Sequence, residues 1–483
     1  MNTLPPDFRF TKIIATLGPA SQSADQMRRL ISAGVDIFRL NMAHADAAWV
    51  NEIVPRIREV ATALNHHVAV MMDVKGPEIR TGDLVEPINL QTGDRIRLIA
   101  VGEPQSVPSE PSVPREFQVS VSYPALAKEV PIGGTVLVAS GMLRLRVIEK
   151  DPKSLLCEVQ NNATLTSRRH INLPGIEVNL PALTEKDIRD LKVGVEAGID
   201  FVALSFVRRA ADVHELKGFL NGAQSKAQII AKIEDEIGLR NFREIALAAD
   251  AIMVARGDLG IEIDYHRLPI VQREMVETCL EVGKPVIIAT QLLESMMSAP
   301  MPTRAEISDV SNAIREQADA VMLSGETTVG QYPVECVEVL RNIIASIQPT
   351  LGRRLNERIV FNYPKTMMLR SAAVLAQQLN SQSAGIVVFT RSGFMASKLA
   401  ALRALNVPVF AFTDVETTCR QLSLPWGLMP FRIEFSPDPD QTISTALDVL
   451  RQNKFCRSGD WLVVVTHVLA NGEVIETMQL RQV

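Results

Sequence analysis

Short apolar runs and amphipathic stretches follow one another in a regular order along much of the chain. Apolar runs that end in polar residues are typical of buried parallel strands, and the stretches between them have helical spacing. Helix start signals stand among them, at Thr184–Asp187 and in the capping box Thr303–Glu306. Strand followed by helix, eight times over, predicts a (β/α)8 TIM barrel. The eight predicted strands are Thr11–Leu17, Ile37–Met42, Val68–Asp73, Phe201–Val207, Gln228–Glu234, Ala251–Ala255, Pro285–Thr290 and Ala320–Leu323.

One interval breaks this rhythm, between Gly82 and about Leu173. We interpret it as a small β-barrel domain inserted after the third strand, at the mouth of the main barrel. Such a lid can close over a substrate and exclude water, although a passive insertion is about as common. Its pattern is one of short alternating strands with Pro and Gly between them: Arg95–Val101, Thr135–Val138, Leu143–Glu149 and Leu155–Val159.

A polar linker near Pro349–Arg358 precedes a third region. Strand-like runs there alternate with helical stretches, at Gly385–Phe389, Val409–Phe412 and Trp461–Thr466, and this predicts an open α/β domain. The expected domains are therefore a barrel at residues 1–82 and 174–348, a β lid at 83–173, and a C-terminal α/β domain at 349–483.

The composition is that of an ordinary globular protein of 483 residues. Its 50 basic and 55 acidic residues give a net charge of −5, so we expect neither a nucleic acid nor a membrane as partner. The start of the chain is unlike a leader peptide and no apolar run is long enough to span a bilayer, which favours a cytoplasmic protein. The five scattered cysteines lack metal-ligand spacing and are expected to be free thiols.

Charged residues stand at the ends of two neighbouring predicted strands. Lys232 and Glu234 end one strand, and Asp258 follows the next. The oxygens of Glu234 and Asp258 suit Mg²⁺, which takes one or two protein carboxylates and leaves its other positions to water and phosphates. Lys232 is placed to stabilise charge that develops beside such an ion. Surface ion pairs at loop ends are the competing interpretation, and these two stretches taken alone slightly favour it.

Polar residues recur at the carboxyl ends of nearly all eight predicted strands, which is where the catalytic groups of a TIM barrel lie. Polar residues at the ends of so many apolar strands are hard to explain by chance, so we expect one active site at the carboxyl ends of the barrel strands. The residues are Arg39, Asn41, Asp73, Lys75, Ser205, Lys232, Glu234, Asp258, Thr290, Ser324 and Glu326.

A candidate phosphate site lies in the C-terminal region. Its residues are Thr390, Arg391, Ser392 and Gly393, between a predicted strand and a helix that begins near Phe394. Backbone donors, a hydroxyl and a guanidinium at a helix start can bind phosphate. An ordinary helix cap explains the same residues and is the commoner case.

Nine long motifs run in order along the predicted barrel. They are FTKIIATLGPAS from Phe10, FRLNMAH from Phe38, MDVKGPEIRTG from Met72, LPALTEKDI from Leu180, IIAKIED from Ile229, IMVARGDLGIE from Ile252, IIATQLLESM from Ile287, PTRAEISDV from Pro302 and VMLSGET from Val321. In these motifs the chain resembles the pyruvate kinase family, while the inserted and C-terminal regions resemble it more in layout than in sequence. The family fold is a barrel with an inserted lid and a C-terminal effector and oligomerisation domain, usually in a homotetramer.

The resemblance implies a phosphotransferase that moves the phosphoryl group of phosphoenolpyruvate to ADP, giving pyruvate and ATP in the last step of glycolysis. Glu234 and Asp258 match the family's Mg²⁺ (or Mn²⁺) ligands. Lys232 and Arg39 match residues on the transferring phosphoryl group. Thr290 matches the family's candidate for protonating the enolate carbon, and we expect its hydroxyl to relay a proton from water.

Further contacts are implied residue by residue. Gly257, Asp258 and Thr290 match substrate contacts in addition to Arg39 and Lys232. Arg80 and Lys186 match contacts to the nucleotide phosphates and lie at the two hinges of the predicted lid.

The chain departs from the family at the monovalent-cation pocket. Asn41 and Asp73 match two K⁺ ligands, but Ala43 and Val74 replace a serine and a threonine that supply oxygens in potassium-dependent members. Potassium-independent members have a lysine where this chain has Glu78, and that lysine's charge can substitute for the ion. We therefore expect K⁺ to activate the enzyme and to bind with modest affinity, at a site that has lost two side-chain oxygens.

The candidate effector loop also departs from the family. Members regulated by sugar phosphates have a hydroxyl-rich loop, whereas Phe394 and Met395 add apolar bulk here. We expect control by a sugar monophosphate or a nucleotide, or no effector, rather than by a bisphosphate.

Two alternatives stay open at this stage. A metal-dependent barrel lyase or aldolase acting on pyruvate-like acids also places Glu and Asp on Mg²⁺, although Lys232, Arg80 and Lys186 favour the kinase. A catalytically impaired regulatory paralogue would fit Ala43 and Val74, but it does not explain the intact Lys232.

Overall fold

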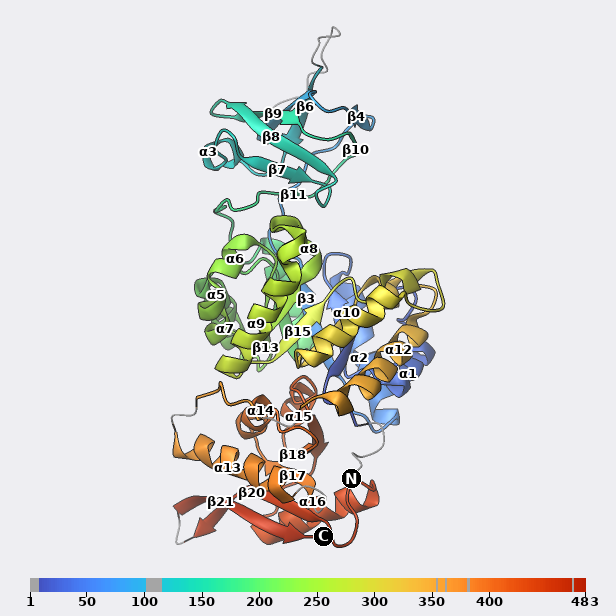
Figure 1. The fold of residues 1–483 in the computed structure, drawn as a ribbon, viewed down its shortest axis with the longest axis vertical. Helices are drawn as coiled ribbons and strands as arrows, with labels where there is room; N and C mark the ends of the chain where they lie inside the picture. Colours follow the sequence, from blue (N-terminus) through green and yellow to red (C-terminus); the bar gives the residue numbers. More distant parts are fainter. Residues whose placement is uncertain (1–7, 101–114, 353–354, 361–362, 380–382, 471–472) are drawn as a thin grey trace.

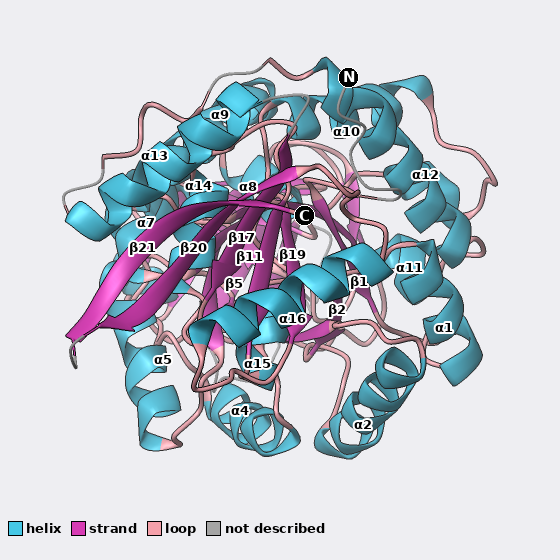
Figure 2. Cartoon of the chain, turned by 90° about the horizontal axis from the view of Figure 1, so that it is seen from below, coloured by secondary structure: helices cyan, strands magenta, loops and turns pink. Residues whose placement is uncertain are grey.

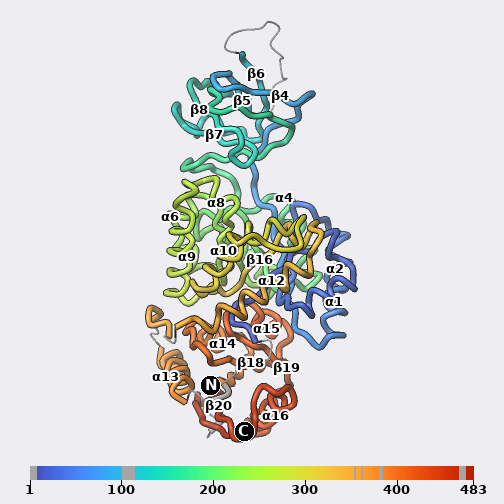
Figure 3. Tube along the Cα trace, turned by 45° about the vertical axis from the view of Figure 1, so that its right-hand side comes forward, coloured from blue at the N-terminus to red at the C-terminus, as the bar shows by residue number. Residues whose placement is uncertain are grey.

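The computed structural model describes residues 8–100, 115–352, 355–360, 363–379, 383–470 and 473–483. The chain forms three parts that are stacked along its longest axis (Figure 1). The inserted lid lies at one end, the barrel in the middle and the C-terminal part at the other end, and Figure 3 shows the same three levels from another side.

Eight parallel strands close the central barrel, as the sequence predicts, in the order β1-β16-β15-β14-β13-β12-β3-β2. Because every strand pairs with two neighbours, this sheet has no exposed edge. Several strands end one or two residues inside their predicted bounds, and β12 differs most: it ends at Leu204 instead of Val207, and Phe206 beyond it has a φ of 53°. The strands are β1 (Lys12–Thr16), β2 (Ile37–Asn41), β3 (Ala69–Val74), β12 (Phe201–Leu204), β13 (Gln228–Ile233), β14 (Ala251–Ala255), β15 (Val286–Ala289) and β16 (Ala320–Leu323).

Helices surround the barrel strands on the outside (Figure 2). The helix start predicted at Thr184 and the capping box predicted at Thr303 are both confirmed, and each residue forms a capping box that begins α4 or α10. The helices are α1 (Ala24–Ala33), α2 (Ala47–Ala63), α4 (Glu185–Ala197), α5 (Ala210–Gly222), α6 (Glu236–Arg240), α7 (Phe242–Ala248), α8 (Arg256–Glu262), α9 (Leu268–Val282), α10 (Arg304–Arg315), α11 (Gly325–Thr328) and α12 (Pro333–Ile347), with short 3-10 turns at Tyr265–Arg267, Glu294–Met297 and Gln348–Thr350.

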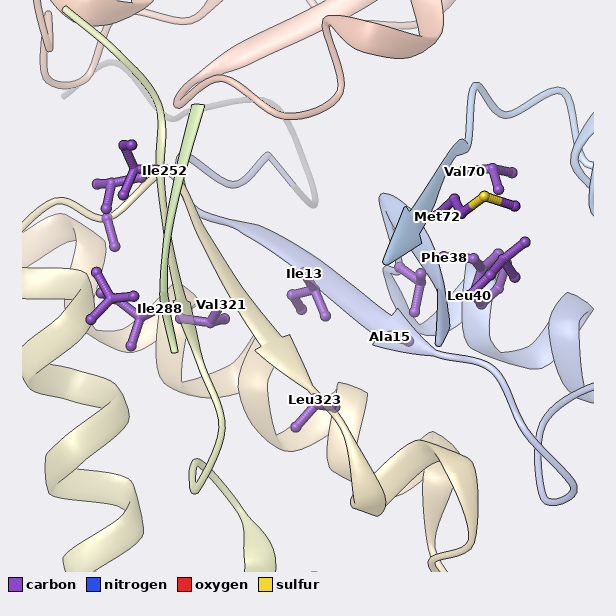
Figure 4. Packing of buried hydrophobic residues seen from close by; sticks show 14 of the residues in the cluster. Ile13, Ala15, Phe38, Leu40, Val70, Met72, Ile252, Ile288, Val321 and Leu323 are labelled. Carbon is purple, nitrogen blue, oxygen red and sulfur yellow. The ribbon is translucent and has the colours of Figure 1, made fainter. Parts of the chain in front are cut away.

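Buried side chains of the barrel strands alternate between two packing layers, as the two-residue period of a strand requires. On β1, Ile13 and Ala15 face the helices, in the layer shown in Figure 4. Ile14 between them faces the barrel interior, together with Ile230 of β13. Leu424 of the C-terminal part joins the interior cluster, so this part closes the base of the barrel.

The lid consists of short strands in two sheets. One has six strands in the order β11-β7-β8-β9-β5-β6, and the other pairs β10 with β4. The predicted strand Arg95–Val101 is observed as β5, and its last residue, Val101, lies outside the described residues. The elements are β4 (Ile88–Leu90), β5 (Arg95–Ala100), β6 (Glu116–Val121), α3 (Leu126–Glu129), β7 (Thr135–Val138), β8 (Leu143–Lys150), β9 (Ser154–Val159), β10 (Ala163–Leu165) and β11 (Ile171–Asn172).

The two edges of the six-stranded lid sheet meet through the segment that enters the lid, which agrees with the predicted small β-barrel lid. Arg80 forms an isolated bridge with His170 next to β11, and Thr81 forms one with Val121 at the end of β6. The sheet is therefore closed by two single-residue bridges at the hinge.

The C-terminal part has one five-stranded sheet in the order β19-β18-β17-β20-β21, parallel except for the last pair. Helices lie between the strands, as expected for an open α/β unit. The elements are α13 (Pro364–Leu379), β17 (Ser383–Phe389), α14 (Phe394–Ala401), β18 (Val409–Thr413), α15 (Glu416–Gln421), β19 (Leu428–Arg432), α16 (Pro439–Gln452), β20 (Trp461–Ala470) and β21 (Glu473–Gln482).

Buried ion pairs attach this part to the base of the barrel. Arg403 Nη2 lies 2.5 Å from Asp319 Oδ2, with side chains that are 2% and 1% exposed. Arg420 Nε lies 2.8 Å from Asp200 Oδ1, and Asp200 also accepts from Arg58 at 2.7 Å. Asp200 and Asp319 immediately precede β12 and β16, so both pairs act at the amino ends of barrel strands.

Lys12 is a third polar contact at this junction. Its Nζ donates to the carbonyl oxygen of Leu428 in β19 at 2.6 Å. Burial lowers the pKa of Lys12 from its usual 10.5 to about 8, although the charges of Asp36 and Asp319 oppose the shift.

Replacement of Lys12 by Met tests this burial. Between about pH 8 and pH 10.5 the unfolded chain binds more protons at Lys12 than the folded chain, so the wild type gains stability as the pH rises through this window. Methionine does not titrate. Urea unfolding at about pH 7.5 and about pH 10 should therefore show the wild type becoming more stable relative to Lys12→Met at the higher pH. A difference that does not change with pH would contradict the expectation.

Candidate active site

A buried cluster of charged and polar side chains lies at the carboxyl ends of β3, β12 and β13. Lys232 Nζ lies 3.1 Å from Asp73 Oδ1 and 3.1 Å from Glu234 Oε1. It also donates to Ser205 Oγ at 2.7 Å. The side chains of Lys232, Asp73 and Glu234 are 10%, 2% and 3% exposed. The expected convergence of strand ends thus brings these four residues into one cluster.

Arg39 extends the cluster on β2. Its Nε lies 2.7 Å from Asp73 Oδ2, and its Nη1 donates to Thr16 Oγ1 at 3.1 Å. Burial alone would raise the pKa of Asp73, but the charges of Arg39 and Lys232 outweigh it and the pKa is lowered. Burial would lower the pKa of Lys232, but Asp73 and Glu234 outweigh it and the pKa is raised. Lys232 is therefore held as an ammonium ion.

Glu234 and Asp258 offer hard oxygen donors to a divalent ion. Glu234 Oε2 accepts from the N–H of Phe206 at 2.7 Å, and Asp258 lies in the first turn of α8. Burial, helped by the charges of Asp258 and Asp73, raises the pKa of Glu234 to about 7 against the lowering effect of Lys232. A divalent cation would relieve this repulsion, so the donor set fits Mg²⁺. Within the described ranges no three His, Cys, Asp or Glu residues group as a metal site.

The Thr290 hydroxyl is held at the ends of β14 and β15. It accepts from the N–H of Gly257 at 2.8 Å. Thr290 and Gln291 have φ angles of 68° and 55°, which is uncommon for residues other than glycine and most of all for the β-branched Thr290. The Arg256 guanidinium donates to their carbonyl oxygens at 2.6 and 3.1 Å and pairs with Asp309 at 2.7 Å. Arg256 therefore stabilises the turn that presents Thr290.

Sequence reasoning missed this function of Arg256. The residue is visible in the sequence as the first polar position after a predicted strand, but its partners are carbonyl groups that follow another strand. No periodicity or motif spacing encodes such a contact. Thr16 likewise joins the cluster only through the pairing of β1 with β2.

Both predicted nucleotide contacts are paired with carboxylates. Arg80 Nε lies 2.6 Å from Glu78 Oε2, which is also 3.1 Å from Lys75 Nζ. Lys186 Nζ lies 2.5 Å from Asp190 Oδ2. A nucleotide phosphate would compete with these carboxylates for Arg80 and Lys186.

The predicted K⁺ ligands also have partners. Asn41 Oδ1 accepts from the N–H of Ala43 at 3.2 Å, and both oxygens of Asp73 contact cations. The negative charge of Glu78 is compensated by Lys75 and Arg80. The charges expected to attract a monovalent cation are therefore largely neutralised within the protein.

The candidate effector loop is a compact turn before α14. Thr390 Oγ1 accepts from the N–H of Gly393 at 2.9 Å, and Arg391 Nε pairs with Asp414 at 2.9 Å. The carbonyl oxygen of Arg391 accepts from Thr418 Oγ1 at 2.8 Å. Ser392 Oγ accepts weakly from the N–H of the first residue of α14, at 3.5 Å. The loop retains donors for a phosphate, but Asp414 competes for its guanidinium.

Comparisons with known proteins agree with this geometry. The family model described as "Pyruvate kinase, barrel domain" matches residues 8–337, and "Pyruvate kinase, alpha/beta domain" matches residues 367–479. The chain belongs to the pyruvate kinase family. The pyruvate kinase of Geobacillus stearothermophilus is 39% identical over 475 residues, which cover 97% of this chain and 79% of that protein. Pyruvate kinase 2 of Synechocystis sp. is 39% identical over 466 residues, with 95% and 76% covered.

A solved structure supports the same assignment. The crystal structure of a pyruvate kinase from Cryptosporidium parvum superimposes with a TM-score of 0.90 at 33% identity, covering 98% of this chain and 96% of that one. The chain is thus an enzyme of the phosphotransferase class, as members of the pyruvate kinase family are. The lyase or aldolase alternative receives no support from these relatives. A search of the described residues finds no helix long and apolar enough to cross a membrane.

Replacement of Asp73 by Asn tests the central ion pairs. The change leaves the buried Arg39 and Lys232 without their shared carboxylate, and breaking a buried pair in this way costs about 3 kcal/mol or more of unfolding free energy. Urea unfolding should show this loss. As a control, Asp448→Asn breaks the exposed pair with Arg451 and should change stability by less than about 0.5 kcal/mol. Equal stability of the two variants would contradict the analysis.

Proposed function

We propose that this protein transfers the phosphoryl group of phosphoenolpyruvate to ADP and forms ATP and pyruvate through an enolpyruvate intermediate, the last step of glycolysis. The observation that carries the proposal is the buried, charged Lys232 between Asp73 and Glu234 at the carboxyl ends of the barrel strands. Membership of the pyruvate kinase family supports the choice of reaction.

Lys232 and Arg39 act on the transferring phosphoryl group. Phosphoryl transfer depends on positioning and charge stabilisation more than on covalent help. Asp73 binds both cations, one on each oxygen, so their separation is set before substrate arrives. Substrate oxygens then meet donors that need little reorganisation.

Glu234 and Asp258 hold Mg²⁺ (or Mn²⁺) in this proposal. When bound, the ion stabilises the negative charge that develops on the enolate and phosphoryl oxygens. The hydrogen bond from Phe206 orients Glu234 for this role, and α8 presents Asp258. Gly257, next to Asp258, contributes its backbone to the substrate contacts.

Thr290 relays a proton to the enolate carbon. Its hydroxyl is a poor acid on its own because its pKa is far above neutral, so the proton comes from water and passes through Oγ1. The bond from Gly257 and the turn held by Arg256 fix the position of that oxygen.

ADP phosphates bind Arg80 and Lys186. Each of these side chains exchanges its carboxylate partner, Glu78 or Asp190, for a phosphate oxygen. Arg80 also forms one of the two bridges that close the lid sheet, so nucleotide binding is coupled to the lid hinge.

K⁺ binds weakly near Asn41 and Asp73. The loss of two oxygens at Ala43 and Val74, and the internal pairing of Glu78, support a low affinity.

The cellular setting and the assembly follow the family. We propose a cytoplasmic homotetramer. Some relatives are plastidial, such as plastidial pyruvate kinase 2 of Arabidopsis thaliana. If an effector binds at Thr390–Gly393, it is a sugar monophosphate or a nucleotide rather than a sugar bisphosphate, and it competes with Asp414 for Arg391.

Replacement of Lys232 by Met tests the proposed chemistry. Turnover should fall by about 10³-fold or more, because charge on the phosphoryl group loses its main cationic partner. Mn²⁺ binding, followed by electron paramagnetic resonance, should stay largely intact since Glu234 and Asp258 remain. The exposed Lys192→Met on α4 is the control and should retain full activity. Retained turnover in Lys232→Met would show that the chemistry lies elsewhere, and an inactive wild type would favour an impaired paralogue.

A cation titration tests the K⁺ site. ATP formation is measured with K⁺ in one series and with tetramethylammonium at matched ionic strength in the other. We expect activity to rise with K⁺ alone and to saturate only at high concentration. Equal activity in the two series would mean that the enzyme, which lacks these two oxygens, does not depend on K⁺.

A further inference from the structure

The lid contacts the metal-binding side of the barrel through a buried hydrogen bond. Asn172 Nδ2 in the lid strand β11 donates to Glu262 Oε1 at 2.9 Å. Asn172 is 4% exposed and Glu262 is 9% exposed. Glu262 is the last residue of α8, the helix that also carries Gly257 and Asp258 (Figure 1). One short helix thus connects the lid with two residues of the proposed site.

Glu262 is placed where a carboxylate is disfavoured. Burial raises its pKa to about 7, and nearby Asp235 and Glu236 add to the shift while Arg208 opposes it. The carboxyl end of a helix also repels negative charge. The hydrogen bond from Asn172 acts in the opposite direction and lowers the pKa. The carboxylate is therefore accommodated at this position through its contact with the lid.

Packing around the pair is incomplete. A cavity of about 40 Å³ lies at this junction and is lined by Asn172 and Glu262 among others. Gly141, in the turn after β7, lies near the same end of α8, since a Cβ atom built on it would be 3.6 Å from Ile261, at ordinary van der Waals distance. The end of α8 therefore lies close to the lid near Gly141 as well as at Asn172.

A second contact leads from His170, the residue before β11, toward the other proposed metal ligand. The His170 ring lies 5.9 Å from the Phe206 ring, centroid to centroid. The N–H of Phe206 donates to Glu234 at 2.7 Å. Residues 170–172 of the lid thus contact Phe206, which donates to Glu234, and α8, which contains Asp258.

We propose that the Asn172–Glu262 hydrogen bond couples the position of the lid to that of α8, which makes Glu262 a positioning residue for Asp258. The proposal rests on the proposed function of Asp258 as a metal ligand. With the bond formed, α8 is held against the lid strand and Asp258 is held toward Glu234. When the bond breaks, α8 loses its lid contact and the divalent ion loses a fixed ligand.

Three variants of the full-length protein test the proposal. Asn172→Asp removes the donor and sets two carboxylates against each other at about pH 8, above the pKa of Glu262. We expect Mn²⁺ binding without substrate to weaken by about 10-fold and turnover to fall by a similar factor. Glu262→Gln keeps an acceptor oxygen for Asn172 and should change both quantities by less than about 3-fold.

The double variant Asn172→Asp with Glu262→Gln restores a donor and an acceptor in exchanged positions. It should recover most of the Mn²⁺ affinity and turnover that Asn172→Asp loses, because the glutamine amide can donate to the new carboxylate. A merely structural defect in the lid would not be repaired by a change in the barrel. Asn89→Asp is the matched control, since Asn89 in β4 bonds Thr164 within the lid, and it should behave like the wild type.

The outcomes separate the two levels of the proposal. If Asn172→Asp binds Mn²⁺ as tightly as Asn89→Asp, or if the double variant is no better than Asn172→Asp, the coupling is refuted. If thermal unfolding shows that Asn172→Asp does not fold, Asn172→Ala is compared with Asn89→Asp in its place, because alanine removes the donor without adding charge. A wild type that binds Mn²⁺ but forms no ATP would overturn the proposed function, while the Mn²⁺ measurements would still decide the coupling.

Discussion

The carboxylate of Asp73 lies between two cations, and the arrangement of the active site depends on it. An ammonium group in the mouth of an apolar barrel is stable only where carboxylates compensate its charge, and Asp73 and Glu234 do this for Lys232. The same carboxylate binds Arg39 on β2. A shift of β13 by one residue would turn Lys232 toward the helices and Ile233 toward the mouth, so the ion pairs and the packing select the same register.

The barrel strands are held at both ends by charged groups. Asp200 precedes β12 and accepts from Arg420 of the C-terminal part, while Ser205, just after the same strand, accepts from Lys232. Asp319 precedes β16 and pairs with Arg403. Because buried pairs are costly to break, these contacts hold the C-terminal part against the base of the barrel.

Much of the fold was predictable, because the barrel strands are continuous apolar runs with helical patterns between them. The strands that the sequence analysis missed lie in the lid and the C-terminal part. They include β6 and β21, which are regular strands of six and ten residues, and several that are short or irregular. β11 has only two residues. β19 contains Pro430, and a proline argues against a strand in the middle of a sheet, but β19 is an edge strand of the C-terminal sheet, where proline is tolerated. The lid was predicted as a small β-barrel, but the two bridges at Arg80 and Thr81 that join the edges of its sheet were not predicted. Isolated bridges have no periodicity for a sequence to reveal.

The sequence by itself determined the alternation of strands and helices, the family, and the identity of the polar residues at the strand ends. It could do so because side-chain period and motif spacing are local properties of the chain. Tertiary structure alone decided which groups meet: Arg256 with the carbonyl of Thr290, Asn172 with Glu262, and Glu78 with Arg80 rather than with a cation. The first two contacts join residues of different elements. Glu78 and Arg80 are two positions apart, but a short separation does not say which partner a side chain takes. In all three cases the choice depends on how strands and loops are brought together in space, which no local pattern encodes.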